Sequence, residues 1–409
     1  MNEERTIVHM DLDTFFVSCE RLIDSRLNNR PIIIGGTTDR GVVASCSYEA
    51  RMYGVHSAMP IKMARERCPE AIILKGDPSN YTHFSKIVTT IISEAAPLYE
   101  KSSIDEFYLD LSGMGKHFSC LQYASELRKK ITYETGLPIS FGLSVNKTVS
   151  KIATGEAKPN NQKHILYGTE KAFLSPLSVK KIPMVGLKTY QTLCELGAKR
   201  ISTIQQMPLE LMQTILGQNG SSIWRKAQGI DLSPVIQHNS NKSISAERTF
   251  DRDTIDVLKL KGIIHAMAEN LAFQLRKKQQ LTACVTVKIR YSDFQTKTMQ
   301  KRIHYSAADH EIIQTVNELF DKLFNRRLLV RLVGIRLSDL VNGHHQMQLF
   351  DENNRLADLY KAMDVIRIRY GEQAVIRAVN MTAKGMLRRF NPFNGAGSEM
   401  ENDTNMEAF

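Results

Sequence analysis

The stretch Thr6-Ile-Val-His-Met-Asp-Leu12 alternates with the two-residue period of a β-strand and is followed at once by Asp13. Its odd positions, Ile7, His9 and Asp11, face one side of the strand, and its even positions face the other. A second acidic pair, Asp105-Glu106, lies at the connection between two further predicted strands. Acids at the ends of neighbouring strands are costly unless positive charge lies between them. Asp11, Asp13, Asp105 and Glu106 therefore mark a candidate functional site.

Strands and helices alternate around this first strand. Further strands are predicted at residues 30–36, 41–45, 98–103, 107–111 and 138–143, and helices at residues 58–68, 81–96, 121–135 and 146–158. Pro69 and Pro159 end two of these helices. The alternation predicts a mixed α/β domain with a sheet at its centre.

The pattern changes after residue 170. Residues 182–230 are purely helical, with turns at Gly186, Gly197, Pro208 and Gly229, and residues 237–242 form a polar linker. Beyond the linker, strands are predicted at residues 284–291 and 331–338 and helices at residues 256–277 and 309–324. The inward side chains of the two strands are Val285, Val287, Ile289, Tyr291, Val333, Ile335 and Leu337. This spacing predicts a second sheet with one wet, basic face and with helices on the other.

Composition restricts the class of protein. A chain of 409 residues has room for two to four domains. It carries 54 basic and 43 acidic residues, and residues 241–341 hold 18 basic against 11 acidic. The surplus favours a polyanionic partner, although a solvated basic face explains the counts equally well. The six cysteines form no CxxC pair, no apolar run reaches the ~18 residues of a membrane helix, and no apolar signal region opens the chain, so we expect a cytoplasmic protein.

The acids favour a metal site. Three carboxylates could hold two divalent metal ions that activate an attacking hydroxyl and stabilise a leaving oxygen in phosphoryl transfer. Adjacent residues of a regular strand point in opposite directions, so Asp105 and Glu106 can share a site only across a bend. The alternative is that Asp13, Asp105 and Glu106 are solvated surface acids.

Two further groups of residues could contact phosphate. Tyr48-Glu-Ala-Arg51 offers a hydroxyl and a planar guanidinium. Lys147, Lys151 and Lys158 share one stripe of a predicted helix, which could meet a triphosphate or a DNA backbone. A solvated helix face is the alternative for both groups.

Together these pieces resemble one family. Met10-Asp-Leu-Asp-Thr-Phe-Phe16, Tyr48-Glu-Ala-Arg51, Ser103-Ile-Asp-Glu-Phe-Tyr-Leu-Asp110 and Ala157-Lys-Pro-Asn160 follow in the order and spacing of the Y-family translesion DNA polymerases. The resemblance covers roughly residues 5–350. It implies template-directed, low-fidelity DNA synthesis past damaged bases by two-metal nucleotidyl transfer, without a proofreading exonuclease.

The resemblance also implies residue roles. Asp11, Asp105 and Glu106, with the backbone carbonyl of Leu12, would hold two Mg²⁺ ions, and Asp13 would not be a catalytic acid. Phe16 would be the steric gate that excludes a ribose 2′-hydroxyl, although a core aromatic beside Phe15 is the alternative. The expected contacts to the incoming dNTP are Phe15, Phe16, Ser45, Tyr48, Arg51 and Lys158.

The implied fold is α+β and multidomain. The expected parts are a palm with a ferredoxin-like α/β sheet (1–13 and 77–170), small fingers (14–76), an all-helical thumb with a helix-hairpin-helix (171–236), a linker (237–241), an α/β little finger with a four-stranded sheet (242–341), a clamp-binding segment (342–354) and an extension (355–409). Fingers of about 60 residues leave few contacts to check the nascent base pair. In the extension we expect a short amphipathic helix at residues 356–370 and a disordered acidic tail.

Primer-template DNA, dNTP and a sliding clamp are the implied partners, with the protein a monomer and no membrane contact. The expected DNA contacts are Lys147, Lys151, Gly186, Lys188, Lys288, Arg290, Arg331 and Arg336. The hairpin Ile182-Pro-Met-Val-Gly-Leu-Lys188 departs from the usual pattern, because Met184 stands where a first glycine is common. Gln346, Leu349 and Phe350 in Gln346-Met-Gln-Leu-Phe350 resemble the peptide that bacterial replication proteins insert into the clamp.

Two other classes of function would explain part of this sequence. A non-catalytic DNA-binding or clamp-tethered factor could keep this fold, but it would not need acids at positions 11, 105 and 106. Another palm-type nucleotidyl transferase, such as a cyclase, would explain the acids but neither the helical thumb nor the basic sheet.

Overall fold

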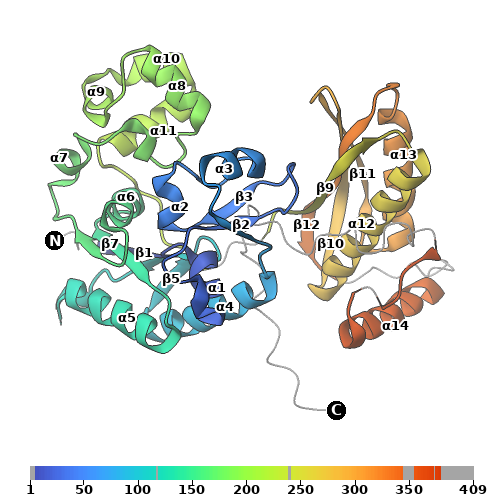
Figure 1. The fold of residues 1–409 in the computed structure, drawn as a ribbon, viewed down its shortest axis with the longest axis horizontal. Coiled ribbons are helices and arrows are strands. Elements are labelled where there is room, and N and C mark those ends of the chain that lie inside the picture. Colours follow the sequence, from blue (N-terminus) through green and yellow to red (C-terminus); the bar gives the residue numbers. More distant parts are fainter. Residues whose placement is uncertain (1–4, 117, 238–240, 344–353, 373, 379–409) are drawn as a thin grey trace. The chain divides into compact units, whose positions relative to one another are not determined.

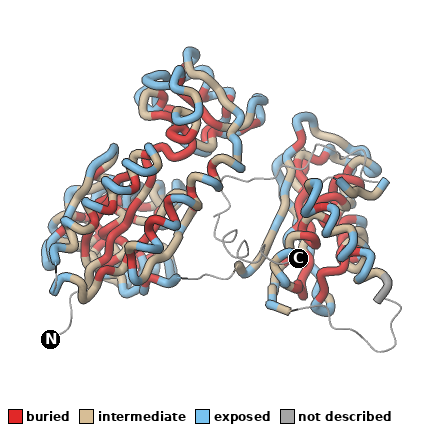
Figure 2. Tube along the Cα trace, turned by 90° about the horizontal axis from the view of Figure 1, so that it is seen from below, coloured by how far each residue is buried: buried red, intermediate tan, exposed pale blue. Residues whose placement is uncertain are grey.

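The computed structural model describes residues 5–116, 118–237, 241–343, 354–372 and 374–378. The chain divides into two compact units, with Met1–Asn239 in unit 1 and Ser240–Asn391 in unit 2. Each unit has a buried interior of its own, as the tube in Figure 2 shows. The division falls within the predicted linker at residues 237–241. No helix in the described ranges is long and apolar enough to cross a membrane.

The central sheet of unit 1 has five strands. Their order is β5 (Leu98–Lys101), β6 (Glu106–Asp110), β1 (Ile7–Leu12), β7 (Ile139–Ser144) and β8 (Gln162–His164). All neighbours are antiparallel except β7 and β8. The helices α4 (Pro78–Ala95) and α5 (Cys120–Thr135) complete a β1-α4-β5-β6-α5-β7 arrangement, the ferredoxin-like sheet that was predicted.

Helix α6 (Lys147–Ala157) packs tightly against this sheet, while α4 and α5 lie on its other face (Figure 1). Two of its hydroxyls bond the backbone of β1: Ser150 Oγ donates to the Ile7 carbonyl at 2.8 Å, and Thr154 Oγ1 donates to the His9 carbonyl at 2.9 Å. On β7, a Cβ added to Gly142 would lie 2.2 Å from the Ser150 carbonyl oxygen. A glycine is therefore required for the close approach of α6 to the sheet.

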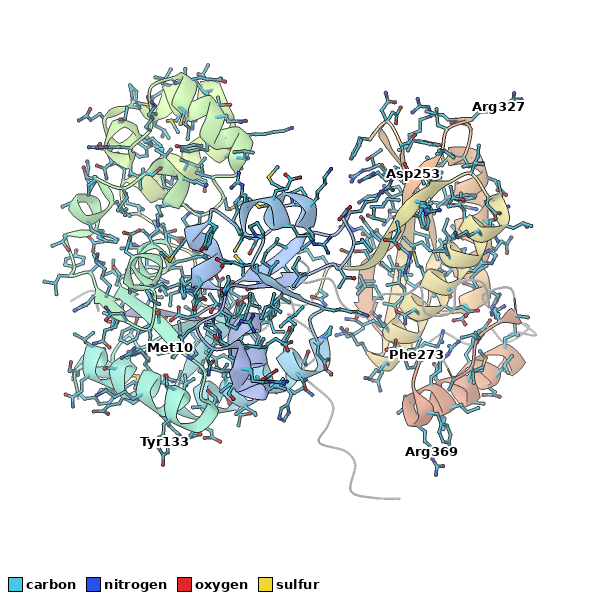
Figure 3. The ribbon with its side chains drawn as sticks, in the orientation of Figure 1. Met10, Tyr133, Asp253, Phe273, Arg327 and Arg369 are labelled. Carbon is cyan, nitrogen blue, oxygen red and sulfur yellow. The ribbon has the colours of Figure 1, made fainter. Side chains whose placement is uncertain are left out.

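Side chains of unit 1 follow the same division between interior and surface. Met10 on β1 is fully buried, whereas Tyr133 on α5 is 91% exposed and projects from the molecule (Figure 3). The six residues of β1 are buried or nearly so, in agreement with a strand covered on both faces.

A smaller sheet lies between β1 and α4 in the sequence. It has the order β3 (Val43–Cys46), β2 (Ile32–Gly35) and β4 (Ile72–Leu74), with α1 (Phe15–Ile23), α2 (Tyr48–Met52) and α3 (Ile61–Arg67). The helix predicted at residues 58–68 begins only at Ile61. Ala58 has a φ of 68°, and its N–H donates to the Val43 carbonyl, so this segment continues the edge of the sheet before Pro60 starts the helix.

The remainder of unit 1 is helical, as predicted for residues 182–230. Its helices are α7 (Glu170–Leu174), α8 (Leu187–Glu195), α9 (Ile201–Gln206), α10 (Leu209–Leu216) and α11 (Gln218–Ala227). Their apolar side chains, among them Leu193, Ile204 and Met212, form one cluster with Val149 and Ile152 of α6. In the hairpin before α8, Met184 has a φ of 77°, the left-handed conformation that glycine adopts without strain.

Unit 2 is built on a four-stranded antiparallel sheet. The strand order is β11 (Thr296–Ser306), β10 (Gln280–Tyr291), β12 (Val330–Asn342) and β9 (Ser243–Thr254). All seven side chains predicted to face inward are buried, and α12 (Val257–Lys277) and α13 (Asp309–Leu323) contribute to the same core. The predicted sheet with helices on one face is confirmed.

Helix α14 (Asn354–Tyr370) also belongs to unit 2. A short amphipathic helix was expected at residues 356–370. In the structure Tyr360 and Arg367 are buried, while Leu359 and Ile366 are exposed. Arg276 of α12 pairs with Asp364 at 2.6 Å, so the helix contacts its neighbours partly through charges. The predicted clamp-binding residues and the acidic tail lie outside the described residues.

Candidate active site

The acids of β1 and β6 meet at one end of the sheet. Asp11 is the register partner of Glu106 across the antiparallel β1–β6 pair. Asp105 precedes β6 in the turn from β5, where its carbonyl accepts the Leu12 N–H at 3.0 Å. Because the chain at Asp105 is a turn and not regular strand, Asp105 and Glu106 need not point to opposite faces of the sheet. The sequence reasoning therefore located all three carboxylates in one neighbourhood.

Each of these carboxylates has a different partner. Lys158 Nζ donates to Asp11 Oδ1 at 2.5 Å, and Lys151 Nζ donates to Glu106 Oε2 at 2.6 Å. Asp105 Oδ1 accepts the hydroxyl of Ser103 at 2.5 Å. Both lysines lie on or directly after α6, so the helix held by Gly142 places two cations beside the acids.

The prediction that the three acids form a ready metal cage is not met by their present side-chain positions. Within the described ranges, no group of three or more His, Cys, Asp or Glu side chains lies close enough to hold a metal ion. Asp11 and Glu106 are instead paired with Lys158 and Lys151.

The charges nevertheless act on one another. Burial raises the pKa of Asp11 to about 7, opposed by Lys158 and reinforced by the charges of Asp105 and Glu106. Burial also raises the pKa of Asp105. Carboxylate oxygens are hard ligands that suit a divalent cation such as Mg²⁺, so the chemistry of these donors fits the metal that the resemblance implies.

Asp13 has a structural environment. It is 1% exposed, and its Oδ2 accepts the hydroxyl of Ser140 at 2.8 Å and the backbone N–H of Asn160 at 2.6 Å. These bonds join the end of β1 to β7 and to the segment that follows α6. Asp13 thereby fixes the position of Lys158, whose Nζ lies 3.5 Å from Asp13 Oδ1.

The residues predicted to contact the triphosphate lie near the same acid. The hydroxyl of Tyr48 lies 3.4 Å from Asp13 Oδ1, and the Arg51 guanidinium lies 5.0 Å from the centre of the Tyr48 ring. Burial is the main cause that raises the pKa of the Tyr48 hydroxyl, so it stays a neutral donor. Ser45 lies on β3 as the register partner of Ile34, three residues before Tyr48 in the chain.

Phe15 and Phe16 open α1 directly after β1. Both are buried, and the ring of Phe16 stacks on Tyr81 of α4 with 4.4 Å between ring centres and 16° between planes. Tyr81 donates its hydroxyl to Glu20 at 2.6 Å, which holds the stack in place. The ring of Phe16 is therefore held in one position by packing, five residues after Asp11 in the sequence.

The structure places Lys147 differently from the DNA contact that was predicted. Its ammonium donates to both carboxylate oxygens of Glu100 at 2.7 Å, and its side chain is 15% exposed. The same Glu100 accepts the backbone N–H of Ile236 at 2.9 Å. Lys147 and Glu100 thus secure the segment that leaves α11, a pairing that the stripe pattern on α6 alone could not reveal.

The predicted basic face of unit 2 is present on β10 and β12. Lys288 pairs with Glu247 of β9 across Gly334, which has no side chain to block it, and Arg336 is exposed. Arg290 donates to Thr296 at 2.8 Å. Arg331 stacks 4.5 Å above the ring of Phe294 at the end of β12. In unit 1, Lys188 is exposed and Gly186 begins α8.

Comparison with known proteins agrees with this geometry. The impB/mucB/samB family model matches residues 10–155, and the model of that family's C-terminal domain matches residues 241–349. DNA polymerase IV of Dehalococcoides mccartyi is 37% identical over 375 residues, covering 91% of this chain and 96% of the relative. DNA polymerase IV of Treponema denticola is 33% identical over 379 residues, covering 91% and 96%.

Solved structures share the fold. A Y-family DNA polymerase chimera superposes with a TM-score of 0.72 at 24% identity, covering 82% of this chain and 99% of that chain. DinB from Sulfolobus solfataricus gives a TM-score of 0.57 at 23% identity, with 83% and 100% covered.

The chain belongs to the Y family of DNA polymerases, with DNA polymerase IV enzymes among its relatives. It is accordingly a DNA-directed DNA polymerase. Similarity over 91% of the chain extends beyond about residue 350, the limit that the sequence motifs indicated, and so reaches the residues of α14.

Proposed function

We propose that this polymerase extends primers past damaged template bases by two-metal nucleotidyl transfer at Asp11, Asp105 and Glu106. The observation that carries the proposal is the pairing of Asp11 with Glu106 beside the turn of Asp105, at one end of the central sheet. These carboxylates and the Leu12 carbonyl would hold two Mg²⁺ ions. When bound, the ions would neutralise charge on the attacking and leaving oxygens.

The protein side chains would position the nucleotide. Lys158, Tyr48 and Arg51 would bind the triphosphate, with Phe15 and Ser45 alongside. The closeness of Lys158 and Tyr48 to the same Asp13 oxygen supports a common site for them. The ammonium of Lys158 would release Asp11 and bind phosphate oxygens of the nucleotide instead. The Asp11 carboxylate would then be free to bind metal. Charge neutralisation and positioning would supply most of the rate acceleration.

Phe16 would be the steric gate for the sugar. Its stacking on Tyr81 supports this role, because a ring packed against a neighbouring ring is restrained from turning away from a 2′-hydroxyl. The same proposal assigns residues 1–13 and 77–170 to the palm, 14–76 to the fingers, 171–236 to the thumb and 242–341 to the little finger. Small fingers and no segment assigned to an exonuclease fit low-fidelity synthesis without proofreading.

DNA would be held by the thumb hairpin and by the outer face of the little-finger sheet. Lys151, Gly186, Lys188, Lys288, Arg290, Arg331 and Arg336 are the proposed contacts. The exposed Arg336 and the open β10–β12 face support this assignment. Binding to phosphates should then weaken steeply as salt rises.

We also propose a cytoplasmic monomer that contacts a sliding clamp through residues 346–350.

The test is primer extension with an Asp105→Ala variant on undamaged and abasic templates containing Mg²⁺. We expect extension to be lost while the Kd for primer-template DNA changes less than about threefold, because this acid would contact metal rather than DNA. A variant that extends primers at the wild-type rate would refute the assignment.

A further inference from the structure

The turn that carries Asp105 is held from two sides. On one side, the Leu12 N–H donates to the Asp105 carbonyl at 3.0 Å. On the other side, Ser85 of α4 donates its hydroxyl to the Ile104 carbonyl at 2.5 Å. Ser85 is 1% exposed, so this bond is made in the interior. The direction of the Asp105 side chain therefore depends on α4 as well as on β1.

Lys101 reaches the same point from the end of β5. Its ammonium donates to Ser85 Oγ at 2.7 Å and to Thr89 Oγ1 at 3.0 Å, and it lies 5.5 Å from the centre of the Phe107 ring. A serine hydroxyl has one proton, which is given to Ile104, so Ser85 must accept from Lys101. The result is a directed relay from Lys101 through Ser85 to the turn.

A partly buried ammonium is a costly way to fill this space. Burial lowers the pKa of Lys101 to about 8, with Lys86 adding to the effect and Asp105 opposing it. An apolar side chain of similar length would avoid the desolvation cost. A residue that weakens the fold next to a proposed catalytic turn is better explained by the geometry of that turn than by stability.

We propose that Lys101 is a positioning residue for nucleotidyl transfer, which acts through Ser85 and the Ile104 carbonyl to hold Asp105 beside Asp11 and Glu106. The inference rests on the proposed role of Asp105. Lys101 lies on the α4 side of the turn and acts on the reaction only through the placement of that carboxylate. Neither the motif pattern nor the stripe on α6 pointed to it.

Three variants test the relay in the full chain. Lys101→Met keeps the length of the side chain and removes its donors, Ser85→Ala removes the relay hydroxyl, and Lys101→Arg retains a charged donor. Lys129→Met, at an exposed position of α5, is the matched control. Two readouts are needed: the single-turnover rate of dNTP incorporation with Mg²⁺, and the affinity for Mn²⁺ measured by electron paramagnetic resonance in a complex with dideoxy-terminated primer-template and dNTP.

We expect Lys101→Met and Ser85→Ala to lower the maximal incorporation rate about tenfold or more, since a misplaced catalytic group loses rate steeply. The affinity for Mn²⁺ should fall in both variants. The Kd for DNA should stay near wild type, and the melting temperature of Lys101→Met should not fall, because methionine avoids the desolvation cost. Lys101→Arg should recover most of the rate, and Lys129→Met should behave as wild type.

Two results would overturn the inference: a wild-type rate in Lys101→Met, or a rate that falls only in proportion to the melting temperature. The comparison with Asp105→Ala separates this failure from failure of the proposed function. If Asp105→Ala is inactive while Lys101→Met is fully active, only the relay is wrong. If Asp105→Ala retains the wild-type rate, the proposed function itself is wrong.

Discussion

Asp11 and Glu106 lie directly opposite each other on β1 and β6, yet their carboxylates turn to two different lysines, Lys158 and Lys151. Both lysines are placed by α6, which lies so close to β7 that only a glycine fits at position 142. The charge balance of the candidate site is thus set by the packing of α6 against β7, the strand next to β1 with its Asp11.

Substitution of Gly142 should therefore destabilise the protein. In Gly142→Ala the new Cβ would lie 2.2 Å from the Ser150 carbonyl, and the backbone of α6 must move. We expect the free energy of unfolding to fall by about 1–3 kcal/mol, measured by urea denaturation.

Gly155→Ala is the matched control on α6 itself. A Cβ there meets no atom within 4 Å, and alanine favours the helix, so stability should rise by about 0.5–1 kcal/mol. Equal stability of the two variants would show that α6 is not held by this contact.

Met184 stores strain in the proposed DNA-binding hairpin. Its φ of 77° is a conformation that costs a side-chain-bearing residue roughly 1 kcal/mol, while 79% of its side chain is exposed and little packing compensates. Met184→Gly should raise the melting temperature of helices α7–α11, followed by circular dichroism. Met184→Ala keeps the strained backbone and should melt close to wild type, so a stabilised alanine variant would argue against strain as the cause.

Phe16 should control sugar selection. Phe16→Ala would open space beside the proposed nucleotide site, so incorporation of ribonucleotides relative to deoxyribonucleotides should increase by about tenfold or more in kcat/KM. Loss of a buried ring also costs roughly 3 kcal/mol, and Phe16→Leu serves as the gentler variant. Unchanged discrimination in both variants, with primer extension intact, would assign Phe16 to the core alone.

Lys101 should make stability depend on pH. Its pKa is about 8 in the folded chain and near 10.4 when unfolded, so between these values the unfolded state binds more protons. Stability from this group therefore rises with pH from about 8 to about 10, by at most about 1 kcal/mol per pH unit.

The measurement is the difference in unfolding free energy between wild type and Lys101→Met at pH 7.5 and 9.5. The subtraction removes the other groups that titrate in this range. A difference that stays constant, or that changes in favour of the methionine variant at high pH, would contradict the burial of a charged ammonium.

Local periodicity predicted much of the fold. Alternation along β10 and β12 identified their buried faces because each strand has one apolar and one wet side. The turns between helices α8–α11 follow Gly and Pro positions. The start of α3 was misplaced because Ala58 bonds to Val43, a contact distant in sequence. In α14, local spacing could not reveal that Arg276, almost 90 residues earlier, pairs with Asp364.

The candidate site was only partly predictable. Acids at strand ends drew attention to Asp11 and Asp105, but their roles came from resemblance to a family rather than from spacing. Lys147 was assigned to DNA because it shares a helix stripe with Lys151 and Lys158, whereas in the structure it pairs with Glu100. Lys101 was missed because a single lysine at a strand end carries no signal until α4 is placed beside it.

The most direct test of the central claim is a crystal structure of the ternary complex with primer-template DNA, an incoming dNTP and Mn²⁺, recorded at a wavelength where manganese scatters anomalously. We predict two anomalous peaks bounded by the carboxylates of Asp11, Asp105 and Glu106, with Lys158 moved from Asp11 to the triphosphate. Anomalous peaks elsewhere, or carboxylates still bound to Lys158 and Lys151 in a complex competent for synthesis, would contradict the account.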